Sequence, residues 1–457
     1  MKPKRMLLLF AVLILAMPFA GQDVQGLEDA EKADRKKDKI KQGWNFGGLP
    51  VVSFDSDLGF QYGALANLYH YGDGSRYPLY DHSFYLEASW FTKGSGIFRF
   101  YYDSDRLIRG IRTSVDISFM PDQAFYLYGY NGYEAVYNKP WITEGAEDYK
   151  TRLFYRYHRE FFRFKADFQG DIVRKKLYWL AGLDFYNIYS TDIDRQKFDI
   201  PDSVSTLFDQ YKEWYIIPES EKSGGRFTVL KLGLVFDTRD NEPNPWRGIW
   251  TEIILASAPK PLSSMERGFM KLAITHRQYF TLIKERLTFA YRLAFQTTIA
   301  GYTPTYAQTI MYYSRMTGAY NEGLGGVKTL RGISRNRIVG DGWVMGNFEL
   351  RYRFLYFQWI KQNWYLAIAG FFDTGRVISL IDVEDVVTAG NGLENYYPQG
   401  ESEVDYFDFG AERFHNSVGG GLYIAMNQNF IIAINFGKAL NEQDGNTGFY
   451  VGLNYLF

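Results

Sequence analysis

The chain has 457 residues, more than one soluble domain usually holds, so it needs several compact units or one large β architecture. Aromatic residues make up 18% of it, which is too many for a dry core but suits a surface that is apolar in the middle and wet at both rims. The 51 Lys and Arg balance 52 Asp and Glu, which removes the electrostatic case for a nucleic-acid partner. No cysteine is present, which excludes disulfides and a lipidated cysteine.

The first segment carries a targeting pattern. Basic residues at positions 2, 4 and 5 precede an unbroken apolar run from Met6 to Met17. This run is too short to cross a bilayer as a helix, so we predict a signal peptide over residues 1–21, cleaved near 20 to 21. Residues 22–46 form a charged tail, expected in the periplasm, that cannot bury enough surface to fold alone. No later stretch has the eighteen or so apolar residues of a membrane helix, which excludes a helical membrane protein.

From residue 47 onward, short segments alternate apolar and polar residues with a period of two. Several of them place arginines or carboxylates on the second face, which does not fit the dry interior of a soluble sandwich. It fits a barrel with lipid outside and water inside. We therefore predict an all-β fold, a transmembrane antiparallel β-barrel over residues 47–457 with about 16 strands. The segments are 50–55, 58–70, 82–94, 96–103, 110–119, 151–168, 175–190, 225–238, 248–258, 267–282, 285–298, 342–355, 363–375, 413–427, 429–438 and 446–457.

The links between these segments agree with a barrel in the bacterial outer membrane. Such barrels have short periplasmic turns and longer extracellular loops. The four longest links, 120–150, 191–224, 299–341 and 376–412, all follow odd-numbered segments. If the chain starts in the periplasm, every long link lies outside the cell.

The last segment places five apolar residues on one face, Phe449, Val451, Leu453, Tyr455 and Phe457. A soluble edge strand would normally be blunted by charge or proline. We therefore expect this strand to run to the final aromatic and to pair with the first strand. Tyr455 and Phe457 resemble the C-terminal signal that outer-membrane proteins present to their insertion machinery.

Several motifs of the C-terminal half resemble the BamA/TamA superfamily of outer-membrane assembly barrels, also called the bacterial surface antigen family. Residues 325–333 are similar to its arginine-glycine loop signature, although Ile333 stands where an aromatic is usual. Residues 346–349 and 371–375 are similar to its wall motifs, and residues 236–248 to its turn between the eighth and ninth strands. The motif positions are Leu330, Arg331, Gly332 and Ile333 in the loop, and Gly346, Asn347, Glu349, Phe371, Asp373 and Gly375 in the wall.

The resemblance implies that the 299–341 link folds back into the lumen, where its arginine meets the two wall carboxylates. The alternation independently places Glu349 and Asp373 on the inner face. Because a guanidinium is a planar fork, it can engage two carboxylates at once. We expect Arg331 to pin the loop in this way.

The family's assembly members usually carry periplasmic POTRA domains that capture a client chain, and residues 22–46 are too short for one. The sequence therefore resembles the barrel-only branch, in which client capture would need a periplasmic or membrane accessory protein. The leading hypothesis is a barrel that assists insertion or translocation of unfolded outer-membrane proteins. It would open the seam between its first and last strands, and the short first segment beginning near Pro50 would help.

Two other functions compete with this hypothesis. One is an outer-membrane pore or transport channel plugged by its own loop, without assembly activity. The other is an enzyme, which the sequence does not favour. None of the five histidines has a serine in a nucleophile-elbow pattern near it, and residues 55–57 fit a hairpin turn better than a metal site. We predict no catalytic residue, no metal and no cofactor.

Overall fold

The computed structural model describes residues 41–77, 79–242, 244–314, 323–359, 362–388, 397–398, 400–426 and 430–457. The predicted signal peptide and most of the charged tail lie outside these residues. Within the described part of the chain, no helix is both long and apolar enough to cross a membrane.

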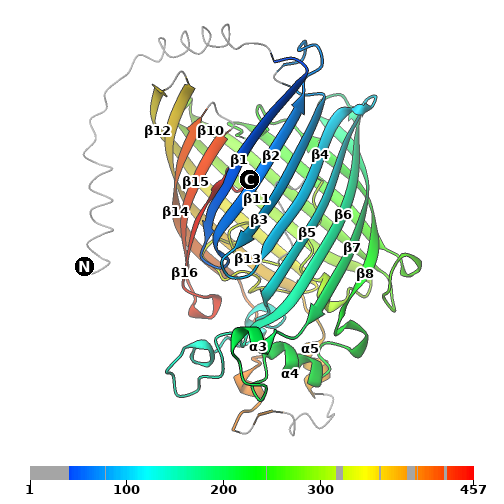
Figure 1. Ribbon diagram of the computed structural model, residues 1–457, viewed down its shortest axis with the longest axis vertical. Coiled ribbons are helices and arrows are strands. Elements are labelled where there is room, and N and C mark those ends of the chain that lie inside the picture. The colour runs from blue at the N-terminus through cyan, green and yellow to red at the C-terminus, as the bar shows by residue number, and fades with distance from the viewer. Residues whose placement is uncertain are drawn as a thin grey trace.

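Sixteen strands of the described chain form one closed antiparallel barrel, in which each strand pairs with its neighbours in sequence and β1 pairs with β16 (Figure 1). The barrel, all-β and antiparallel, confirms the predicted fold class. The strands are β1 Trp44–Asp55, β2 Gly59–His70, β3 His82–Phe91, β4 Gly96–Ile108, β5 Ile111–Tyr126, β6 Arg156–Val173, β7 Leu177–Thr191, β8 Gly224–Asp237, β9 Gly248–Ala258, β10 Phe269–Ile283, β11 Leu287–Gly301, β12 Gly342–Trp359, β13 Gln362–Ser379, β14 His415–Met426, β15 Phe430–Ala439 and β16 Thr447–Leu453.

Helices occur only in the links of the described chain, chiefly the long ones. The α-helices are α3 Arg195–Phe198, α4 Leu207–Glu213 and α5 Val383–Thr388. The single 3-10 turns are η1 Gly132–Glu134, η2 Lys139–Ile142, η3 Glu219–Glu221, η4 Lys260–Leu262, η5 Thr305–Ala307, η7 Glu403–Asp405 and η8 Glu442–Asp444.

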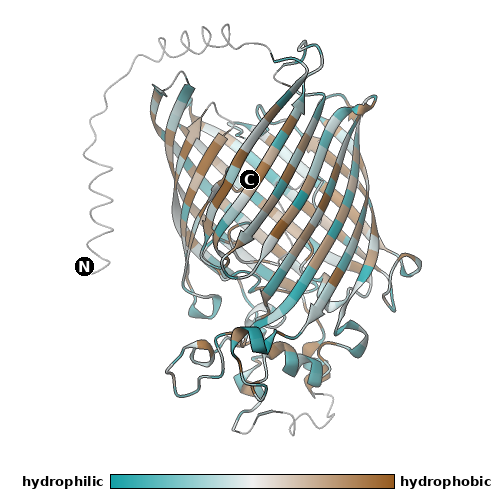
Figure 2. Ribbon diagram, viewed as in Figure 1, coloured by the Kyte–Doolittle hydropathy of each residue, from teal (hydrophilic) through white to brown (hydrophobic). Residues whose placement is uncertain are grey.

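The two faces of the barrel wall differ in the way the alternation predicts. On β8, Leu230, Leu232 and Leu234 point outward and are 44%, 65% and 45% exposed. Lys231, between them in sequence, is buried and lies 2.6 Å from Asp167 Oδ1 and 2.7 Å from Asp184 Oδ1, measured from its Nζ. Hydrophobic and hydrophilic residues alternate along the strands in Figure 2. Apolar side chains thus face lipid, and charged ones are paired inside.

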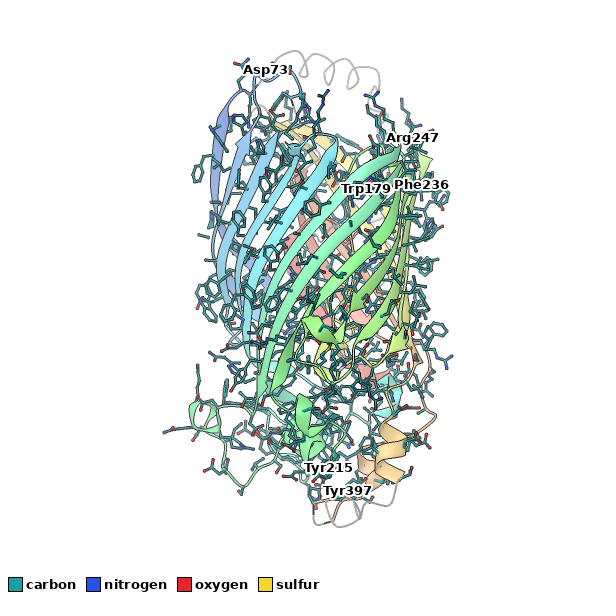
Figure 3. The ribbon with its side chains drawn as sticks, turned by 90° about the vertical axis from the view of Figure 1, so that its right-hand side faces the viewer. Asp73, Trp179, Tyr215, Phe236, Arg247 and Tyr397 are labelled. Atoms are coloured by element: carbon teal, nitrogen blue, oxygen red, sulfur yellow. The ribbon has the colours of Figure 1, made fainter. Side chains whose placement is uncertain are left out.

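The end of the barrel that carries the long links is covered by a cap. Aromatic and aliphatic side chains from links 127–155, 192–223, 302–341 and 380–414 bury one another there, including Trp141, Phe154, Tyr211, Trp214 and Tyr406. Figure 3 labels Tyr215 and Tyr397 at this end, and Asp73 and Arg247 at the opposite end with the short turns. The lumen is therefore closed on the side of the long links by a packed apolar core.

Each predicted segment overlaps one strand, and the largest difference is at β5, which ends at Tyr126 and not at residue 119. The first and last strands also differ from their predicted bounds. The first strand begins at Trp44, ahead of the predicted boundary at residue 47, so it is 12 residues long and not short. The last strand stops at Leu453, so the prediction that it runs to Phe457 was wrong. The chain is redirected at Asn454, which has a left-handed φ of 68°.

Candidate functional site

The link between β11 and β12 enters the barrel, and its second described stretch, residues 323–341, is called the lumen loop. Its Arg331 donates from Nε and Nη2 to the two carboxylate oxygens of Asp373, at 2.8 and 2.9 Å. Nη1 donates to Glu349 Oε1 at 2.5 Å, and the backbone N–H of Arg331 donates to Asp373 Oδ2 at 3.0 Å. The three side chains are 1% or less exposed. The structure thus brings the predicted arginine and both predicted carboxylates into one buried cluster.

Two neighbours complete the surroundings of this cluster. The guanidinium carbon of Arg331 lies 3.5 Å from the ring centroid of Phe371, which places the cation on an aromatic face. Arg351 Nε donates to Glu349 Oε2 at 2.7 Å, so this carboxylate holds one arginine with each oxygen. Because every charge has a hydrogen-bonded partner, burial of the cluster is tolerated.

The register of β12 and β13 explains how these groups meet. Asn347 lies opposite Asp373 and Glu349 opposite Phe371, and these four residues share the inner face of neighbouring strands. Asn347 Nδ2 also donates to the backbone O of Thr329 in the lumen loop at 2.6 Å. Positions two residues apart on each strand therefore present both carboxylates and an amide to one stretch of the loop.

The remaining motif residues differ in what they do. Leu330 and Ile333 are fully buried in a hydrophobic cluster on either side of Arg331. A Cβ added to Gly375 would come within 2.8 Å of Leu330 Cδ1, so this glycine makes room for the loop. Gly346 does not face the loop, because a Cβ there would meet outward-facing Leu293 and Phe348.

Gly332 is where the lumen loop comes closest to β15. Its φ is 90°, and an added Cβ would lie 2.5 Å from the backbone N of Lys438. The facing Gly437 is equally constrained, since its Cβ would lie 2.7 Å from the carbonyl carbon of Arg331. Two glycines thus allow backbone to touch backbone.

We expect Gly332→Ala to destabilise the folded barrel by about 2 kcal/mol or more. The added methyl group is unfavourable both in the left-handed backbone conformation and because it would overlap the backbone of β15. Urea unfolding in lipid vesicles would measure the loss. Gly410→Ala is a suitable control, because its φ of 81° is also left-handed but an added Cβ meets nothing within 4 Å. Equal losses in both variants would show that the contact with β15 contributes nothing.

Sequence reasoning missed two further arginines of the lumen loop. Arg335 Nη1 donates to Asp122 Oδ2 on β5 at 2.8 Å. Arg337 donates to three backbone carbonyls in other links, those of Gln443, Gly132 and Ala135, at 2.7 to 2.9 Å. The basic spacing after the motif was the available signal, but carbonyl partners in distant links leave no trace in a sequence.

The seam between β1 and β16 is the second candidate feature. β1 pairs with β2 along its whole length, from Trp44 opposite His70 to Asp55 opposite Gly59. It pairs with β16 only at Phe54 with Val451 and at Asp55 with Tyr450. Beside this pairing, Ser56 N–H donates to the backbone O of Phe449 at 3.1 Å. Most of the edge of β1 on the side of β16 therefore has no pairing strand within the described residues.

The turn after β1 contains a carboxyl group in an unfavourable environment. Burial, reinforced by the neighbouring charge of Asp55, raises the pKa of Asp57 to about 7. The charged form of this carboxyl is therefore disfavoured by burial beside the paired part of the seam.

The last residues turn away from the seam and into the barrel. Tyr455 is buried with its ring centroid 4.5 Å from that of Tyr423. Arg351 places its guanidinium carbon 4.2 Å from the Tyr455 ring and donates from Nη2 to the backbone O of Phe457 at 3.0 Å. These contacts with the buried Arg351 thus explain why the last residues leave the predicted lipid-facing strand.

A closed barrel with aliphatic residues outside, paired charges inside and a link returned into its lumen defines an integral β-barrel protein of the outer membrane. The family model of the Omp85 superfamily domain matches residues 109–457, and the chain belongs to this superfamily. The resemblance to the BamA/TamA barrels is thereby confirmed. Barrels of this superfamily are in general insertion or transport proteins and not enzymes.

The chain is similar to two solved structures, of which the first supports the likeness of fold. BamA from Haemophilus ducreyi lacking POTRA domains 1-3 has a TM-score of 0.52 at 14% identity, over 91% of this chain and 71% of that chain. CdiB from Acinetobacter baumannii has a TM-score of 0.45 at 13% identity, over 91% of this chain and 60% of that chain. No curated protein sequence matches the chain.

Proposed function

We propose that this protein assists the insertion or translocation of unfolded proteins at the outer membrane, and that a client strand pairs with the free edge of β1. The observation that carries the proposal is the seam, where β1 and β16 share two register pairs while β1 and β2 pair throughout. Membership of the Omp85 superfamily supports it.

The energetics favour a client at this position. Each backbone N–H or C=O left unpaired in hydrocarbon costs several kcal/mol, so the edge of β1 from Trp44 to Ser53 is a strong acceptor for an extended segment. A client that adds a strand there satisfies these groups without unfolding the barrel. Separating the seam requires the loss of the two register pairs at Phe54 and Asp55 and of the hydrogen bonds between Ser56 and Phe449.

The length of the last strand supports the same proposal. The seven residues of β16 span about 23 Å, and a tilt near 40° reduces this to about 18 Å along the membrane normal. The hydrophobic band of such barrels is usually about 25 Å tall. A short strand beside the seam thus perturbs the bilayer where the client would enter. The short strand at the seam is therefore the last one, and not the first one as predicted from the sequence.

The lumen loop has a structural part in this proposal. Arg331 fixes it to β12 and β13, Arg335 fixes it to β5, and Gly332 lies against β15. The loop therefore bridges opposite walls and keeps the barrel in shape while the seam opens. Tyr455 and Phe457 would serve as a targeting signal only before folding, because Tyr455 is buried in the finished barrel and Phe457 is bound there by Arg351.

The test is depletion of the protein from cells, followed by a census of folded outer-membrane barrels. We expect the folded fraction of one or more client barrels to fall and unfolded precursors to accumulate in the periplasm. Re-expression of the chain should restore them. An unchanged census would contradict an assembly role.

The alternative is a pore or channel plugged by the lumen loop. Because the lumen loop and the cap are packed by buried contacts, both proposals predict a barrel that is closed at rest. Conductance in planar bilayers therefore distinguishes the two functions only when it is combined with the census of folded barrels. Steady conductance that rises when residues 299–341 are deleted, with no change in folded barrels after depletion, would favour the pore. Clients and an accessory protein that delivers them are the partners that the assembly proposal requires.

A further inference from the structure

Three short turns at the end opposite the cap repeat one pattern. The turns joining β4 to β5, β6 to β7 and β10 to β11 each have two aliphatic residues followed by a basic one, at 107–109, 172–174 and 282–284. In each turn the next residue has a left-handed backbone, with φ of 77° at Gly110, 60° at Lys175 and 59° at Glu285. We call residues 105–111, 171–177 and 282–287 the rim turns.

Both aliphatic residues of each rim turn are exposed, which a regular strand would not allow. The pairing is irregular between Ser104 and Ile108, between Asp171 and Val173, and between Thr281 and Ile283. Such a bulge breaks the alternation of side chains, so two successive residues can face outward. The exposed fractions are 56% and 41% for Leu107 and Ile108, 52% and 50% for Ile172 and Val173, and 56% and 52% for Leu282 and Ile283.

The rim turns are also basic. They hold seven basic and three acidic residues, and one of the acidic residues, Asp105, is engaged by Arg76 of another turn. The basic residues are exposed except for the half-buried Arg286. They are Arg106, Arg109, Arg174, Lys175, Lys176, Lys284 and Arg286.

We propose that the rim turns form an anchor for the anionic phospholipid headgroups of the leaflet on that side of the membrane. The turns of a barrel lie where hydrocarbon gives way to headgroups. There the aliphatic pairs would enter the acyl region while the adjacent cations reach lipid phosphates, as long basic side chains do at membrane surfaces. Figure 3 shows a similar order at a neighbouring turn, with Arg247 beyond Phe236 and Trp179 at the same end.

The rim turns lie away from the seam. The rim turns belong to strands β4 to β11, and the seam lies between β1 and β16 on the other side of the closed barrel. One side of the barrel would thus be held at a fixed depth by lipid contacts. The side with the seam would remain free of this restraint.

The test uses the folded full-length protein in phosphatidylcholine vesicles, with spin-labelled phosphatidylglycerol and spin-labelled phosphatidylcholine as probes. We expect the protein to prefer phosphatidylglycerol by roughly two- to threefold averaged over its lipid shell. The preference should approach unity in 0.5 M NaCl, because salt screens the attraction. No preference at low salt would overturn the proposal without any variant.

A pair of matched variants locates the effect. Lys175→Gln with Lys176→Gln should lower the preference by roughly a third, because two cations of one rim turn are lost. Lys139→Gln with Lys197→Gln removes the same charge from exposed positions in the cap and should leave it unchanged. Heat-modifiability on gels checks that both variants are folded. Equal preference in the two double variants would overturn the assignment to the rim turns.

Discussion

Arg331→Ala is expected to destabilise the folded barrel by about 3 to 5 kcal/mol, because it leaves two buried carboxylates without their shared partner. In the native protein that arginine makes four hydrogen bonds to Glu349 and Asp373, one of them from its backbone. The expected signs are loss of heat-modifiability, a lower urea midpoint in vesicles and cleavage of the lumen loop by added protease. Arg331→Lys should lose less stability than Arg331→Ala, because lysine keeps the positive charge but lacks the planar guanidinium.

Two controls separate the ion cluster from a general effect of changing an arginine. Arg152→Ala removes a guanidinium from an exposed loop position, where it makes one bond of 3.3 Å to the Phe198 carbonyl, and should change little. The triple variant Arg331→Met, Glu349→Gln, Asp373→Asn removes all three charges together and should recover part of the loss. A native unfolding profile for Arg331→Ala would refute the anchoring role.

Locking the seam should abolish client assembly while leaving the barrel folded. Because the chain has no cysteine, the double variant Phe54→Cys, Val451→Cys introduces a single possible disulfide across β1 and β16. Under oxidising conditions the folded fraction of client barrels should fall to the level seen on depletion. A reductant should restore it, because the block is covalent and local.

A matched lock elsewhere in the wall tests the specificity of this effect. Leu183 and Leu230 are also paired across neighbouring outward-facing positions, on β7 and β8. A disulfide in Leu183→Cys, Leu230→Cys should leave client assembly unaffected. If the seam lock has no effect either, clients do not enter between β1 and β16, and the free edge of β1 has another purpose.

The fold could be predicted from the sequence because the signals that determine it are local. Alternation with a period of two requires only neighbouring residues, so Lys231 between two leucines already shows which side faces lipid. The same alternation puts Glu349 and Asp373 on the inner face, where the register of β12 and β13 also holds them. The positions of the links were predicted from the clusters of polar residues that separate the alternating segments.

The candidate site could be predicted from the sequence only in part. Arg331 was identified from its motif, but Arg337 binds the carbonyls of links that are far away in the sequence, and no composition rule marks a carbonyl as an acceptor. The inward turn of Tyr455 also depends on Arg351 of β12, although the alternating pattern alone favours a longer strand.

The sequence by itself determined an outer-membrane barrel, its strand number and the inner and outer faces of its wall. The tertiary structure decided where the barrel is weakly closed. Two strands of ordinary composition meet at only two register pairs, because the chain turns inward at Asn454 before β16 can extend along β1. That outcome reflects a competition between backbone pairing at the seam and side-chain contacts in the lumen. Only the three-dimensional arrangement brings both sets of partners together.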